Sequence, residues 1–115
     1  MDYTDRLRRL AINDERLAET DVGDVAGVEG RLDSKSLALA RIAALVSVGG
    51  AEPSFGAQVD AAISSGTTAT QIVDVLLGVI PIVGLPLVVA AAPKVALALG
   101  HDLDIDDVLG EADTR

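Results

Sequence analysis

The chain has 115 residues, the size of one domain, and its 18 acidic and 9 basic residues give a net charge of −9, which argues against nucleic acid as a partner. Because it contains no cysteine, it has no disulfide framework, no thiolate metal site and no cysteine nucleophile. Half of the residues are hydrophobic but only 2% are aromatic, and a chain this small cannot bury so much aliphatic surface alone, so the composition predicts a homo-oligomer.

The first 31 residues are polar and predict a helical leader followed by a loop. Thr4 is placed to cap a short helix, and Asn13 marks a second helix start. Residues 20–30 are rich in glycine and acids, which favours a loop. The N-terminus has no apolar stretch typical of a secretory signal, so we expect a cytoplasmic protein.

The compact domain is predicted to begin near residue 32 with two helices. Asp33 is a good N-cap for a helix over 34–48, which is apolar nearly all round and therefore central. A Gly-Gly pair ends it, Pro53 fits the first turn of the next helix, and Gly66 is a natural stop for that helix.

A second pair of helices is predicted to complete the domain. Thr68 and Gln71 match a capping box, in which each side chain accepts a hydrogen bond from the other residue's backbone. Pro81 is expected to kink or end that helix. Gly84-Leu85-Pro86 predicts a corner that leads to a final core helix through Leu99.

The uncharged run over 75–92 is long enough for a membrane-spanning helix, which is the main alternative to this interpretation. Pro81, Gly84 and Pro86 would break such a helix near its middle, and no aromatic or basic cluster anchors its ends. No alternating pattern supports a strand. We therefore predict an all-α fold without a membrane segment, with its compact domain over 32–100 and an acidic tail over 101–115.

A specific series of segments spans the predicted domain. In order, it contains LDSKSLALARIAAL, a Gly-Gly stop, a short helix ending in SSGTTATQIVDVLLGV, then IVGLP and KVALALG. This series resembles the carboxymuconolactone decarboxylase family, which includes alkylhydroperoxidase D-like proteins. The resemblance covers about residues 32–100 and implies a compact helical bundle that assembles as a homotrimer or homohexamer.

The peroxidase branch of that family uses a Cys-x-x-Cys pair together with a histidine and a glutamate. Aligned without gaps, those four positions fall on Ala51, Ser54, Gln58 and Leu39 of this chain. Hydroxyl, amide and aliphatic groups supply neither thiol redox chemistry nor a proton relay near pH 7. Peroxidase chemistry by that route is therefore excluded.

The decarboxylase branch of the family needs no cysteine. The resemblance to that branch implies histidines in the helix over 55–65, but this chain has no histidine there. Our candidate site is an apolar pocket between helices, bordered by Arg41, Ser54, Gln58 and Asp74. Arg41 could bind the carboxylate of a small organic acid, and Asp74 could act as a base. The alternatives are an Arg41 that pairs with an aspartate or extends to the surface, and an exposed Asp74 near the start of its helix.

Other polar groups offer little chemistry. His101 follows a helix end, where a lone imidazole interacts favourably with the helix dipole. The aspartates of the tail alternate as in a calcium loop but lack its glycine and its closing glutamate, so we expect no metal and no cofactor. Two hypotheses remain: acid–base chemistry on a small organic acid, or a catalytically silent protein that binds a small ligand or serves in assembly.

Overall fold

The computed structural model describes residues 2–13 and 32–100 of the chain. The chain divides into two units, Met1–Asp33 and Ser34–Arg115, and each is treated by itself. The predicted second helix start after Asn13, the glycine-rich loop, His101 and the acidic tail lie outside the described residues.

Helix α1 spans Tyr3–Ala11 and is capped by Asp2, whose carboxylate Oδ1 accepts a hydrogen bond of 2.8 Å from the backbone N–H of Asp5. The prediction that Thr4 caps this helix is wrong. Asp2 has the extended backbone that an N-cap needs and lies three residues before the donor, whereas Thr4 already belongs to the first turn. The helix therefore begins two residues earlier than the sequence pattern indicated.

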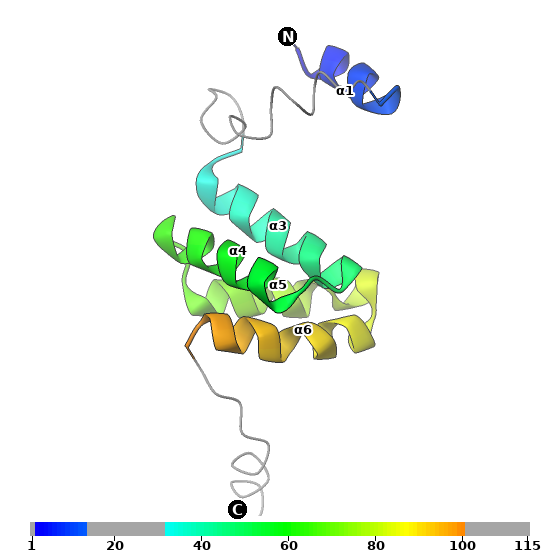
Figure 1. Ribbon diagram of the computed structural model, residues 1–115. Coiled ribbons are helices and arrows are strands. Elements are labelled where there is room, and N and C mark those ends of the chain that lie inside the picture. The colour runs from blue at the N-terminus through cyan, green and yellow to red at the C-terminus, as the bar shows by residue number, and fades with distance from the viewer. Residues whose placement is uncertain (1, 14–31, 101–115) are drawn as a thin grey trace, which may run out of the picture. The chain divides into compact units, whose positions relative to one another are not determined.

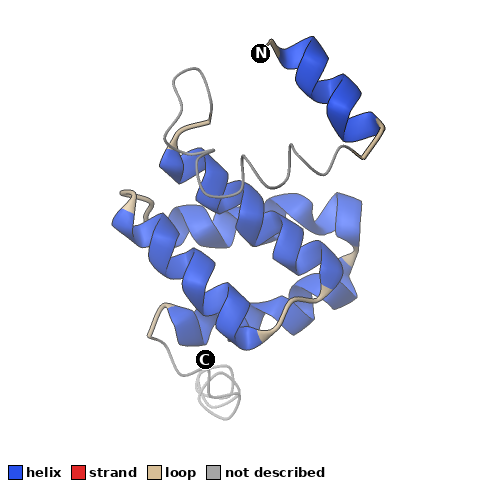
Figure 2. Ribbon diagram, turned by 45° about the horizontal axis from the view of Figure 1, so that its top comes forward, coloured by secondary structure: helices blue, strands red, loops and turns tan. Residues whose placement is uncertain are grey.

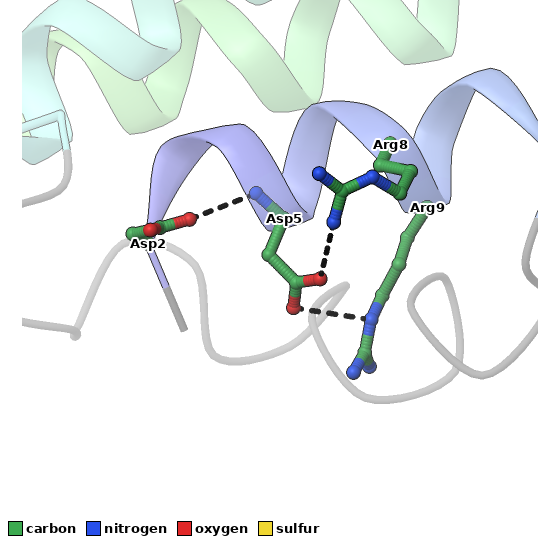
Figure 3. A network of polar contacts seen from close by, with 4 residues as sticks. All are labelled: Asp2, Asp5, Arg8 and Arg9. Atoms are coloured by element: carbon green, nitrogen blue, oxygen red, sulfur yellow. Dashed lines mark hydrogen bonds and ion pairs between the residues drawn. The ribbon is translucent and has the colours of Figure 1, made fainter.

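Figure 3 shows the polar contacts along α1. The carboxylate of Asp5 lies 3.5 Å from Arg8 Nη1 and 3.4 Å from Arg9 Nε, one turn further along the helix. All three side chains are at least one-third exposed, so water and salt weaken these pairs. They are compatible with a helix that depends little on ion pairs for its stability.

The second unit contains a bundle of four helices (Figure 1). These are α3, Ser34–Val48; α4, Glu52–Ser64; α5, Ala69–Val83; and α6, Leu85–Ala98. Helices α3 and α6 each pack against both α4 and α5, and they also contact each other less extensively. Figure 2 shows no strand in the described part of the chain, and the predicted all-α fold is confirmed.

The bundle has a small aliphatic core built at helical spacing. On α3 the buried residues recur every four positions, which places them on one face of the helix. Phe55, the single phenylalanine of the chain, is completely buried at the start of α4. The remaining core residues are all small or aliphatic: Ala38, Ile42, Val46, Val59, Ala62, Ile72, Leu76, Val88, Ala91 and Val95.

Local sequence signals set most of the helix ends in the bundle. Thr68 accepts a hydrogen bond of 3.1 Å from the Gln71 backbone, and the Gln71 side chain accepts one of 3.0 Å from the Thr68 backbone, so the predicted capping box is confirmed. Pro53 lies in the first turn of α4, as predicted. Gly84 forms the corner between α5 and α6 with φ of +91°, a conformation that favours glycine.

Helix α5 does not end at Pro81 but continues to Val83. Proline removes one backbone donor, and near the end of a helix this breaks a single hydrogen bond. The apolar run over 75–92 is divided at Gly84, which confirms two helices in place of one. Among the described residues, no helix combines the length and the apolar character needed to cross a membrane.

Candidate functional site

A groove between α3 and α4 brings three of the four candidate residues together. Arg41 comes from α3, whereas Ser54 and Gln58 come from α4, where their spacing of four residues places them one above the other on the same face. The groove has a volume of about 430 Å³. Its other lining residues are aliphatic: Ala44, Leu45, Val48 and Ala57.

The polar groups of this groove are available to a ligand. Arg41 and Ser54 are exposed, and neither side chain has a hydrogen bond or an ion pair within the described part of the chain. The expected pairing of Arg41 with an aspartate is therefore not formed, and the alternative of a side chain extending to the surface fits the structure. The guanidinium keeps its donors free for a carboxylate.

Gln58 is the least satisfied of the three groups. Its side chain is half-buried, and its amide oxygen Oε1 is shielded from solvent without a hydrogen-bond partner among the described residues. A buried acceptor left in this state costs about 1–3 kcal/mol. Rotation of the amide toward the groove would let a ligand donor satisfy it.

Asp74 does not belong to this groove. It is exposed on α5, as the alternative interpretation of this residue predicts, and borders a second hollow of about 430 Å³ between α5 and α6. That hollow is otherwise lined mainly by aliphatic residues, including Val73, Ala92 and Val95. The structure thus separates the candidate base from the candidate carboxylate-binding group.

Two of the positions that correspond to the thiol relay, Ala51 and Leu39, carry aliphatic side chains that cannot donate or accept a proton. Ala51 is the N-cap of α4, with no side-chain hydrogen bond, and Leu39 packs against the core from α3. Together with the absence of cysteine from the whole chain, this leaves no residue for thiol chemistry. Within the described residues, no three potential metal-ligating side chains come together.

Lys94 supports the groove from outside it. Its ammonium group donates a hydrogen bond of 2.8 Å to the carbonyl oxygen of Gly50 and lies 5.8 Å from the centre of the Phe55 ring. It thereby ties α6 to the turn that carries Ser54 into position. No local pattern in the sequence signals this hydrogen bond, because the two residues lie 44 positions apart in the chain.

The comparison with protein families agrees with this architecture. The model of the carboxymuconolactone decarboxylase family matches residues 13–97, which is most of the chain. The chain therefore belongs to that family, as its motifs indicated, and it lacks the Cys-x-x-Cys pair. No curated protein and no solved structure gives a significant match.

Proposed function

We propose that this member of the carboxymuconolactone decarboxylase family binds a small organic acid in the groove between α3 and α4 without converting it. The observation that carries the proposal is the composition of the groove. Arg41, Ser54 and Gln58 offer a cation, a hydroxyl and an amide within one aliphatic hollow, which suits a compact molecule with a carboxylate at one end.

The same composition argues against acid–base catalysis there. None of the described residues lining the groove is an aspartate, glutamate or histidine, so none can take up or release a proton near neutral pH. The competing hypothesis of acid–base chemistry depends on Asp74, which lines the other hollow. A groove with recognition groups and no base is suited to binding.

Binding can be tested by NMR titration of the full chain with a panel of three- to six-carbon carboxylic acids, each with and without a hydroxyl group. We expect Arg41→Gln to weaken binding about tenfold, since a charge-assisted hydrogen bond contributes roughly 1.5 kcal/mol or more. Lys35→Gln is the matched control, because Lys35 is a cation of the same helix that does not line the groove. Equal affinity in wild type and Arg41→Gln would contradict the proposed site.

The absence of turnover needs a separate measurement. Each acid that binds is incubated with the protein, and substrate loss and carbon dioxide release are followed. We expect neither to exceed the background rate. Turnover that disappears in Asp74→Asn would overturn the silent assignment and restore the acid–base hypothesis.

The assembly and location of the chain belong to the same proposal. Members of this family often form oligomers, and the aliphatic composition of this chain favours self-association. We therefore propose a homotrimer or homohexamer in the cytoplasm. Sedimentation analysis of the full chain would reveal the number of subunits.

A further inference from the structure

The groove between α3 and α4 has its polar groups at opposite ends. The two helices are joined by the short turn over residues 49–51, so the end of α3 lies beside the start of α4 (Figure 1). On α3, Arg41 comes seven residues before Val48, the last residue of that helix. On α4, Ser54 lies in the first turn and Gln58 one turn later. Ser54 therefore lies at the end of the groove near the turn, whereas Arg41 and Gln58 lie toward the far end.

Aliphatic side chains separate these two ends. Ala44 and Leu45 of α3 and Ala57 of α4 line the groove between them. They follow Arg41 or Ser54 by three or four residues, which places them on the same helix faces as those polar groups. A ligand hydroxyl beside this stretch meets no hydrogen-bonding side chain among the described lining residues, so its burial there is unfavourable.

The far end of the groove suits a carboxylate. Arg41 is the one cation among the described lining residues, and its guanidinium has no ion pair in the described part of the chain. Gln58 supplies a second donor at this end. Only Oε1 of its amide is shielded from solvent, so Nε2 is accessible and can donate a hydrogen bond to the same carboxylate. The two donors together fix the orientation of an acid in the groove.

The end near the turn suits a neutral hydroxyl. Ser54 is exposed, and its hydroxyl group has no hydrogen bond within the part of the chain that the structure describes. It can both donate to and accept from a ligand hydroxyl. Glu52 lies two residues before Ser54 in the same turn, and its negative charge disfavours a second carboxylate there.

The distance between the two ends restricts the length of the ligand. Because a helix rises by about 1.5 Å per residue, Ser54 and Gln58 lie about 6 Å apart along α4. In an extended acid of five or six carbons, the carboxylate carbon and a hydroxyl oxygen on the last carbon are about 6–8 Å apart, since each bond of about 1.5 Å advances the chain by about 1.3 Å. A hydroxyl on the second or third carbon stops beside the aliphatic stretch, short of Ser54.

We propose that the groove selects unbranched acids of five or six carbons that carry a hydroxyl on the last carbon. The carboxylate is bound by Arg41 and Gln58, and the terminal hydroxyl is bound by Ser54. This specificity rests on the proposed function, because it names which organic acids the groove binds. Ser54 is then the residue that distinguishes a terminal hydroxyl from one closer to the carboxylate.

The test compares three six-carbon acids by NMR titration of the full chain: 6-hydroxyhexanoate, 3-hydroxyhexanoate and hexanedioate. We expect 6-hydroxyhexanoate to bind about three- to tenfold more tightly than the other two, the effect of one neutral hydrogen bond. Ser54→Ala should reduce this preference to below about twofold, because the hydrogen bond to the terminal hydroxyl is lost. Ser64→Ala is the matched control and should keep the preference, because Ser64 is an exposed serine of α4 that does not line the groove.

The specificity and the proposed function fail in different ways. Equal affinities of the two hydroxy acids, tighter binding of hexanedioate, or a preference that persists in Ser54→Ala would overturn the specificity while organic acids still bind. A preference lost equally in Ser64→Ala would also overturn it. If no acid of three to six carbons binds to the wild type, both the specificity and the proposed function are wrong. Circular dichroism should show the same helix content in wild type and both variants, which separates a lost contact from unfolding.

Discussion

Two adjacent threonines before α5 have opposite hydrogen-bonding environments. Thr67 is only 4% exposed, and its hydroxyl oxygen has no hydrogen-bond partner among the described residues. Thr68 is exposed, and its hydroxyl oxygen accepts a hydrogen bond of 3.1 Å from the backbone N–H of Gln71. The same substitution, Thr→Val, should therefore change stability in opposite directions at the two positions.

The expected sizes follow from the two environments. In Thr67→Val, a methyl group replaces a hydroxyl whose burial without a partner costs about 1–3 kcal/mol, so we expect a gain of about 1–2 kcal/mol in the free energy of unfolding. In Thr68→Val, the helix loses the side chain that caps its first turn, which costs about 1 kcal/mol. Valine keeps the branched shape of threonine, so side-chain entropy changes little.

Chemical denaturation followed by circular dichroism measures both effects. Protein concentration must be held constant, because self-association adds to the apparent stability. In thermal unfolding, the midpoints of the two variants should differ by about 8–24 °C, since about 2–3 kcal/mol separates the variants and each 1 kcal/mol shifts the midpoint of a domain this size by about 4–8 °C. A Thr67→Val variant less stable than wild type would show that the hydroxyl has a partner after all and would refute the reasoning.

Two further comparisons test the contacts that position the helices. Lys94→Met should lower the free energy of unfolding by about 2 kcal/mol. The substitution keeps the aliphatic stem but removes the charged hydrogen bond to Gly50 and the contact with the Phe55 ring. A loss below about 0.5 kcal/mol, the size of a neutral surface change, would contradict this role of Lys94. Gly84→Ala should destabilise the chain by about 1–3 kcal/mol, because the φ angle of Gly84 is +91°. Gly78→Ala should stabilise the chain by about 0.5–1 kcal/mol, because Gly78 lies inside α5 with free space around the added methyl group. Urea titration measures both changes, and equal effects would be evidence against a strained corner at Gly84.

The sequence predicted best those features that depend on neighbouring residues. The capping box at Thr68, the start of α4 at Pro53 and the corner at Gly84 each follow from backbone requirements within a few residues, and all three are present. The error at the first helix has the same local origin. Thr4 and Asp2 are both acceptable N-caps, and only the backbone conformation decides between them.

Features that depend on packing could be predicted only in part. Helical spacing places Ser54 and Gln58 on one face of α4, which was visible in the sequence. That Arg41 of α3 faces the same groove depends on how two helices pack, which no local pattern determines. The hydrogen bond between Lys94 and Gly50 joins distant parts of the chain and has no local signal.

The separation of Asp74 from Arg41 follows from the helical period of α5. Ile72 and Leu76 are buried and fix the side of α5 that faces the core. Asp74 comes two residues after Ile72 and therefore points about 200° away from it, toward the outer surface of α5. The groove with Arg41 opens on a different helix pair, α3 and α4, so a local change in α5 cannot bring the carboxylate to it. Acid–base chemistry in that groove would require a proton-transfer group on α3 or α4, where the described lining residues provide none.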